Sequence, residues 1–140
     1  YWFGNRPELI SDLRGDGVDD VTNRVVDIID LYPYSNTYTM YPGPNRNTLT
    51  TWVGRLIPEL KLDLPPTAIG KDCLGDKLIA KVPSGTGFQF SVFGFLGLLA
   101  GVEEGIEINL AGLTFGIDPL DLALKLPAIG RIASQPHAKT

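Results

Sequence analysis

The alternation of apolar and polar residues between positions 78 and 117 is the feature that most restricts the fold of this chain. Three runs in this region, LIAKV, GFQFSVFG and GIEINLAGLTFGI, are separated by the turn sequences PSGTG and VEEG. A period of two residues is typical of β-strands with one buried face. Glycines inside the runs predict bulges or bends. The second half of the chain is therefore predicted to form a mostly antiparallel sheet.

The apolar side chains of these strands are the largest candidate for a hydrophobic core. A helix predicted over residues 18–32 has a matching apolar stripe, because Val18, Val21, Val25 and Ile28 recur at three- and four-residue steps. We expect this helix to cover the sheet, since two apolar faces are best buried against each other. The residues expected to be mostly buried are Phe88, Phe90, Val92, Leu96, Ile106, Ile108 and Leu110.

The remaining elements of the N-terminal half are predicted to be mainly helical. In NRPELISDLRG, Asn5 is a candidate cap, Pro7 falls in the first turn and Gly15 ends the helix. Another helix begins within residues 45–48 and ends near Pro58. Three shorter segments are also predicted: a strand over 36–41, a short strand or extended segment over 60–64, and one or two helical turns in DPLDLALKL, capped by Asp118.

These elements predict one α+β domain over residues 1–133, with N-terminal helices packed on the C-terminal sheet, and a flexible tail over 134–140. The only methionine is Met40, and the opening YWFGNRPE lacks the basic region and apolar run of a signal peptide. We therefore expect an upstream segment to be missing. The aromatic residues at positions 1–3 are expected to pack against this domain, that segment or a partner.

Composition excludes several functional classes. The chain has 44% apolar and 20% charged residues, which is typical of a globular protein, and its net charge of −4 without a Lys/Arg cluster excludes nucleic acid. One cysteine and one histidine form neither an internal disulfide nor a structural zinc site. The apolar run from Phe88 to Val102 is shorter than the roughly 20 residues of a membrane-spanning helix. No metal or cofactor is expected.

The segment YPGPNRNTLTTWV admits two interpretations. In the first it is a stiff turn and a helix cap: Pro42 and Gly43 suit a type II turn, and Asn45 or Asn47 caps the helix. In the second, the free N–H groups and the positive dipole end of the helix act together with Arg46. They then bind a carboxylate, a phosphate or a polarised carbonyl.

The segment LPPTAIGKDCLGDK also has two interpretations. It is either a surface loop with a weak Lys–Asp ion pair, or a loop that packs over the start of the predicted helix and contributes to a site there. The second interpretation predicts a pocket for a small anionic or amide-bearing ligand. Its ligand-binding residues are Asn45, Arg46, Asn47, Thr48, Lys71 and Asp72.

No catalytic residues are predicted. A thiol nucleophile needs a base, and the only histidine, His137, lies far from Cys73 in the C-terminal tail. Ser84 in PSGTG lacks the strand–turn–helix context of a nucleophile elbow, and SGTG lacks the lysine of a phosphate loop. The glutamates of VEEGIE are interpreted as part of a charged turn.

The motifs FGNRPELISDLRG, YPGPNRNTLTTWV, PELKLDLPPTAIGKD and PSGTGFQFSVFGFLGLLAGVEEGIEINLAGLTFGIDP resemble those of an uncharacterised bacterial family, a domain of unknown function. The resemblance extends to about Gly130, and PGPNRNT and LPPTAIGKD are its most specific parts. Members of that family have an additional N-terminal segment, often with a membrane-anchoring stretch. They carry a serine and an aromatic residue where this chain has Arg46 and Cys73. The resemblance implies a place in the bacterial envelope, periplasmic or at the inner membrane, and peripheral membrane contact through the upstream segment.

A second, more distant resemblance is to permuted papain-like hydrolases and acyltransferases. In these enzymes a nucleophilic cysteine stands at the start of a helix and faces a sheet that carries a histidine. GPNRNTLTTWV is similar, with Arg46 or Asn47 at the place of the cysteine. This resemblance implies a papain-like scaffold without its nucleophile, hence a non-catalytic binding or assembly module with a protein partner. The alternative is a hydrolase or acyltransferase whose base lies upstream.

Overall fold

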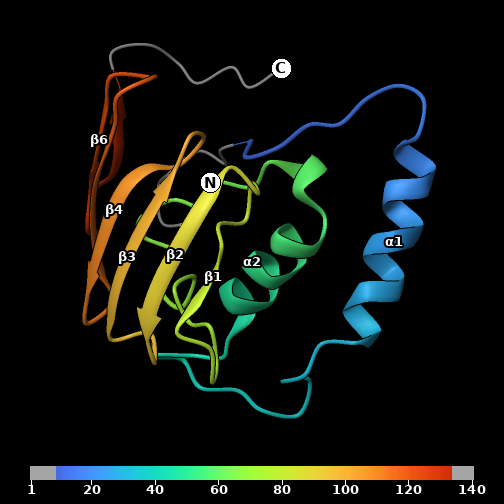
Figure 1. Cartoon of the computed structure of the whole chain (residues 1–140), viewed down its shortest axis with the longest axis horizontal. Coiled ribbons are helices and arrows are strands. Elements are labelled where there is room, and N and C mark those ends of the chain that lie inside the picture. The colour runs from blue at the N-terminus through green and yellow to red at the C-terminus, as the bar shows by residue number, and fades with distance from the viewer. Residues whose placement is uncertain (1–8, 134–140) are drawn as a thin grey trace.

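The computed structural model describes residues 9–133, and Figure 1 shows two helices followed by one sheet. Helix α1 spans Val18–Asp30, helix α2 spans Arg46–Leu56, and a 3₁₀ helix, η1, spans Pro58–Leu60. The strands are β1 (Ile79–Lys81), β2 (Gly87–Val92), β3 (Leu96–Gly101), β4 (Gly105–Leu110), β5 (Leu113–Asp118), β6 (Ala123–Leu126) and β7 (Gly130–Ala133). They form a seven-stranded sheet in sequence order, and each strand pairs antiparallel with the next. The predicted α+β class and antiparallel sheet are confirmed.

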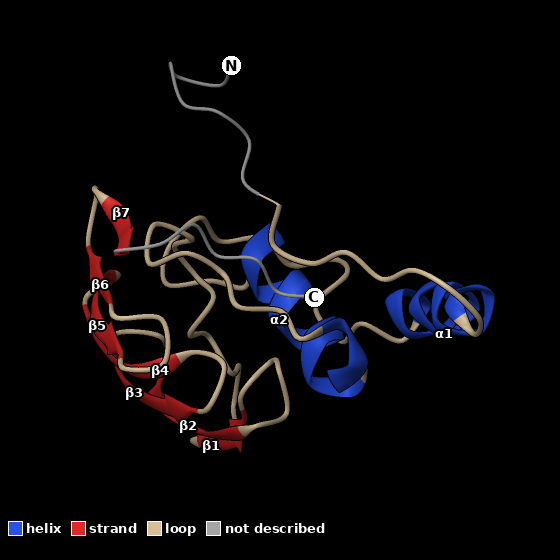
Figure 2. Ribbon diagram, turned by 90° about the horizontal axis from the view of Figure 1, so that it is seen from above, coloured by secondary structure: helices blue, strands red, loops and turns tan. Residues whose placement is uncertain are grey.

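The sheet is curved, as Figure 2 shows from above. Helix α2 and the loops that follow it fill the concave side, whereas α1 stands apart on the far side of α2. The small apolar core lies between α2, these loops and the inner face of the sheet. Its members are Tyr32, Val53, Ile57, Leu64, Cys73, Leu74, Val82, Leu99 and Ala123.

The prediction that the apolar strand residues are buried is wrong. Phe88, Phe90, Leu96, Ile106, Ile108 and Leu110 are exposed, and Val92 is half-buried. The inner face carries the polar residues of the alternation instead, and the buried members include Gln89, Ser91, Glu107, Asn109, Thr114 and Lys125. The physical reason is that the concave side is filled by charged and polar loop residues, which hydrogen-bond to this inner face.

The predicted amphipathic helix is confirmed as α1, but its predicted position over the sheet is wrong. None of its residues is buried, and it contacts α2 rather than any strand. An exposed ion pair between Arg24 Nη1 and Glu59 Oε1, 2.8 Å apart, joins it to η1. The acidic face of α1, with Asp19, Asp20 and Asp27, points to solvent.

Three short predicted elements are also wrong. Residues 36–41 contain turns, bends and irregular backbone instead of a strand, and residues 9–14 are not helical. Residues 61–65 form no strand, so of the two alternatives predicted for 60–64 only the extended segment remains. DPLDLALKL forms no helical turn, because Asp118 ends β5 and accepts hydrogen bonds from the backbone N–H groups of Leu120 and Asp121. The prediction for the aromatics at positions 1–3 and for the tail falls outside the described residues.

Candidate functional site

The start of α2 is built by an asparagine cap. The Asn45 side-chain oxygen accepts hydrogen bonds from the backbone N–H groups of Asn47 (2.9 Å) and Thr48 (3.2 Å), and Thr48 Oγ1 accepts one from Asn45 N–H. This reciprocal arrangement is a capping box. The first interpretation of the motif therefore accounts for Asn45 and Thr48.

The loop at residues 67–73 packs directly on this helix start. Asn45 Nδ2 and Asn47 Nδ2 both donate to the Ile69 carbonyl, at 3.0 and 2.8 Å, and Thr48 Oγ1 donates to the Gly70 carbonyl at 2.7 Å. The contact between helix start and loop is as predicted. The asparagine amides and the threonine hydroxyl are used within the protein, and only Arg46 is exposed. A ligand-binding role for these residues stays a prediction.

Lys71 and Asp72 point away from that surface, into the concave side of the sheet. Both are buried, and their charged groups are 3.8 Å apart. Asp72 accepts hydrogen bonds from Gln89 Nε2 (2.9 Å) and from Asn109 Nδ2. The interpretation of this segment as a surface loop with a weak ion pair is therefore wrong, because the pair lies inside the fold.

Glu107 is the centre of a buried ionic network. One of its carboxylate oxygens pairs with Lys71, and the other lies 2.6 Å from Lys125 Nζ, which also contacts Asp63 at 3.0 Å. Burial raises the pKa of Glu107, but the charges of Lys71 and Lys125 outweigh it and hold this pKa below its ordinary value. Burial lowers the pKa of Lys71, and Asp72 and Glu107 outweigh it and raise that pKa. Lys71 and Glu107 are therefore charged at neutral pH.

Glu104 forms a second buried carboxylate site. It accepts hydrogen bonds from Ser84 N–H (3.0 Å) and from Ser84 Oγ (2.9 Å). Burial raises the pKa of Glu104 despite these hydrogen bonds. VEEG is a turn, as predicted, but Glu104 and Glu107 are structural residues of the interior rather than surface charges.

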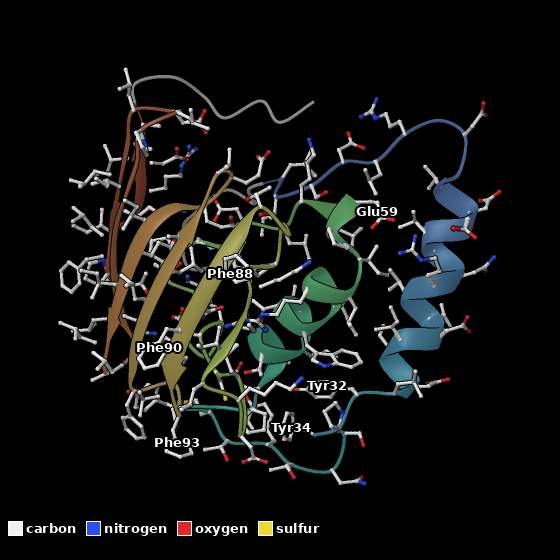
Figure 3. All side chains as sticks on the ribbon, in the orientation of Figure 1. Tyr32, Tyr34, Glu59, Phe88, Phe90 and Phe93 are labelled. Atoms are coloured by element: carbon white, nitrogen blue, oxygen red, sulfur yellow. The ribbon has the colours of Figure 1, made fainter. Side chains whose placement is uncertain are left out.

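A cavity of about 270 Å³ lies beside α2, between this helix, β1 and the turn that follows α1. Tyr32, Tyr34 and Trp52 form an aromatic cluster in its wall, with ring centroids 5.6 Å apart for Tyr32–Tyr34 and 5.3 Å apart for Tyr32–Trp52. Figure 3 shows Tyr32 and Tyr34 close together near the start of α2. Thr48 and Cys73 also line the cavity, so it adjoins the capping site.

The Tyr32 hydroxyl is the unusual group of this cavity. Its oxygen is buried and has no hydrogen-bond partner among the described residues. Burial, with smaller effects of Cys73 and Tyr34, raises the pKa of Tyr32 to about 12, so the hydroxyl is neutral. A buried hydroxyl without a partner costs about 1–3 kcal/mol. A bound molecule that accepts its hydrogen bond would remove this cost.

Basic residues supply the charge of the cavity. Arg55, Lys77 and Lys81 line it, and no carboxylate is among its described lining residues. Burial lowers the pKa of Arg55 to about 10, against the opposing charge of Asp72, so Arg55 stays charged at neutral pH. Its guanidinium is held by Gln89 Oε1 (2.7 Å) and by the Lys81 carbonyl (3.0 Å). The cavity therefore combines aromatic surface with positive charge.

Sequence reasoning missed most of these residues. It named Cys73 only as an improbable nucleophile and did not single out Tyr32, Arg55, Glu107 or Lys125 as site residues. The strand residues were detectable, because Gln89, Ser91, Glu107 and Asn109 all occupy the polar positions of a regular alternation. Within residues 9–133 there is no cluster of His, Cys, Asp or Glu that would hold a metal ion, and no helix long and apolar enough to cross a membrane.

The comparison with protein families identifies the chain. A family model described as "protein of unknown function (DUF3750)" matches residues 1–73, just over half of the 140 residues. The chain belongs to the DUF3750 family. The DUF3750 match includes both helices and the loop at residues 67–73 that packs on the start of α2, and it ends before β1. No curated protein and no solved structure matches the chain.

Proposed function

We propose that this DUF3750 protein is a non-catalytic binding module that takes a small anionic ligand with a flat apolar part into the cavity beside α2. The observation that carries this proposal is the buried Tyr32 hydroxyl, which has no partner among the described residues and belongs to the wall of a positively charged cavity. The ligand's acceptor oxygens would bind Tyr32 and the nearby cations. Its apolar part would stack against Trp52.

The proposed binding residues differ in one respect from the sequence-based prediction. The residues of the helix start were predicted to bind the ligand themselves, but Asn45 and Asn47 are hydrogen-bonded to the neighbouring loop. We assign them the task of fixing the geometry of α2. Thr48 belongs to both the cap and the cavity wall, and it links the two.

The probe for this proposal is 2-naphthoate, which has a flat apolar body and a carboxylate. An aromatic acid of about 13 heavy atoms should bind with a Kd of about 0.1–1 mM, given the usual efficiency of small ligands. Binding is followed by NMR chemical shifts of the Trp52 indole N–H and the Thr48 amide. Naphthalene-2-methanol, the neutral analogue, should bind about tenfold more weakly, because it lacks the charge that the cations attract.

Three variants test the residues. Lys77→Gln with Lys81→Gln should weaken 2-naphthoate binding about fivefold or more, and Lys61→Gln, a matched exposed lysine outside the cavity, should leave it unchanged. Tyr32→Phe should weaken binding without lowering Tm, because the hydroxyl has no partner to lose. Equal binding of the neutral analogue, or an equal effect of the Lys61 control, would refute the proposal.

A papain-like thiol hydrolase or acyltransferase is the second candidate, favoured by the position of Cys73. A Cβ atom built on Gly43 would lie 2.9 Å from both Cys73 Cβ and Thr48 Oγ1, so the cysteine stands beside the start of α2. Thiol chemistry needs a base, and the described cavity lining contains neither histidine nor carboxylate. Turnover of p-nitrophenyl acetate that is lost in Cys73→Ala would favour this candidate over the binding module.

A further inference from the structure

The outer face of the sheet is apolar across its whole width. Its cross-strand rows are continuous: Phe90 pairs with Leu98, Leu98 with Ile108, and Ile108 with Phe115. A second row of paired residues runs from Phe88 on β2 to Ile132 on β7, through Ala100, Ile106, Ile117 and Leu124. The exposed outer residues are Phe88, Phe90, Leu96, Leu98, Ile106, Ile108, Leu110, Leu113, Phe115, Ile117, Leu124 and Ile132. Each of them exposes between 41% and 66% of its surface, and Figure 3 shows Phe88 and Phe90 on the side of β2 away from α2.

The size of this face is unusual for a protein surface. If each of these side chains exposes about half of its roughly 150–200 Å², they present on the order of 1,000 Å² of apolar area together. A typical monomer has a largest apolar patch of about 300–600 Å². The outer face therefore exceeds what a monomer normally leaves in water, and it reaches the area that one partner contributes to a stable complex.

The chemistry of the face favours hydrocarbon over a protein partner. Among the outward-facing positions of the described strands, Lys81 on the edge strand β1 is the only charged residue. The face has no tyrosine, tryptophan or arginine, the residues in which the energetic hot spots of protein interfaces are enriched, and it offers no side-chain partner for hydrogen bonds. Its phenylalanines, leucines and isoleucines match the apolar interior of a lipid layer.

The shape and the charge distribution of the molecule favour the same occupant. The outer face is convex (Figure 2), so a second copy placed face to face would touch it only along a narrow strip, whereas fluid lipid chains follow its curvature. A shallow depression of about 400 Å³ near the β3–β4 turn, lined partly by Ala100 and Ile106, adds to this apolar surface. The acidic helix α1 lies on the opposite side of the molecule, where it would face water.

We propose that the outer face of the sheet is a membrane-docking surface that binds the hydrocarbon layer of a lipid bilayer. The domain lies on the membrane with its outer side chains immersed, and the backbone of the sheet stays near the headgroups, where water can reach the edge strands. The interaction is hydrophobic and shows no preference for charged headgroups. It is independent of the ligand proposed for the cavity beside α2, which shares only the edge strand β1 with the outer face.

The test is flotation of the purified chain with vesicles of phosphatidylcholine, a zwitterionic lipid. The wild type should float with the vesicles, and raising the salt from about 50 mM to about 500 mM should not release it, because the face carries only one charge, Lys81 at its edge. Leu98→Lys combined with Ile108→Lys should reduce the bound fraction about tenfold or more. The control is Leu31→Lys combined with Met40→Lys, two apolar residues outside the sheet that are more exposed than Leu98 and Ile108 (73% and 75% against 50% and 46%), and it should float like the wild type.

A second measurement reports immersion directly. The fluorescence of the Phe115→Trp variant should be quenched by vesicles of phosphatidylcholine with brominated acyl chains more strongly than that of the wild type, whose two tryptophans are Trp2 and Trp52. Circular dichroism and light scattering of every variant establish that it is folded and give its oligomeric state.

Three results would overturn the proposal. The first is a folded wild type that fails to float, and the second is a Leu98/Ile108 variant that floats as well as the wild type. The third is a wild-type dimer that does not float and becomes a monomer in the Leu98/Ile108 variant. That result would assign the face to a second copy of the chain.

Discussion

Replacing Glu107 with glutamine is the most informative test of the polar interior. Glu107 is 1% exposed and lies between Lys71 and Lys125. Glutamine keeps the size of the side chain but removes the charge, so each lysine loses one of its buried partners. Asp72, 3.8 Å from Lys71, and Asp63, 3.0 Å from Lys125, remain.

The expected loss of stability is large because the charges are out of water. Removing one partner of a buried ion pair costs about 3–5 kcal/mol, mainly because the other charge stays buried without compensation. For a domain of this size, such a loss lowers Tm by about 10–15 °C. The assay is urea unfolding followed by circular dichroism, supported by calorimetry.

The matched control is Arg24→Gln. Arg24 and Glu59 form an ion pair of 2.8 Å, similar in length to the Lys125–Glu107 pair, but their side chains are 39% and 49% exposed. The loss there should be at most about 1 kcal/mol. If Glu107→Gln also costs less than about 1 kcal/mol, burial does not strengthen this network, and the reasoning is refuted.

The pH dependence of stability gives an independent check that the charge of Glu107 stabilises the fold. The folded-state pKa of Glu107 lies below the ordinary value of 4.5, so this group contributes stability that is fully present above about pH 4.5 and is lost as pH falls through the folded-state pKa. The difference in stability between wild type and Glu107→Gln should therefore shrink in acid. A difference that grows below pH 4.5 would contradict the assignment.

Two further predictions concern the start of α2. Asn45→Ala should lower the free energy of unfolding in urea by about 1–2 kcal/mol because it removes the cap. Asn47→Ala should lower it by only about 0.5 kcal/mol, because the Asn47 side chain makes one exposed hydrogen bond to the loop. Equal losses would argue against the cap. Gly70→Ala should lower Tm more than Gly15→Ala does, although both glycines have positive φ. The reason is that a Cβ on Gly70 would lie 2.2 Å from Asn45 Nδ2, whereas a Cβ on Gly15 would meet nothing within 4 Å. Equal Tm values for these two variants would show that the loop yields easily.

The sequence was sufficient to predict the strands but not which face of the sheet is buried. A period of two residues places Phe90 and Gln89 on opposite faces, and hydrophobicity alone assigns the phenylalanine to the inside. The structure has the reverse orientation, because Arg55 and Asp72 meet Gln89 on the concave side. Nothing local to β2 encodes these contacts, which come from residues 34 and 17 positions away.

The candidate site shows the same limit. The capping role of Asn45 follows from local sequence rules, and it is present in the structure. The partnership of Tyr32, Trp52 and Cys73 in one cavity depends on how the turn after α1 meets α2 and the following loop, so no short motif indicates it. Lys71 looked like a surface residue because its partner Glu107 lies 36 positions further along the chain.

The strand order of the sheet has a consequence for the rate at which the protein folds. Each strand pairs with its neighbour in sequence, so the sheet can grow by successive hairpins with a small loss of chain entropy at each step. The contacts that hold the polar interior span far more chain: 36 positions for Lys71–Glu107 and 62 for Asp63–Lys125. We therefore expect these ion pairs to form after the folding barrier. Glu107→Gln should then speed unfolding and leave the folding rate nearly unchanged, a result that stopped-flow measurements over a range of urea concentrations would test.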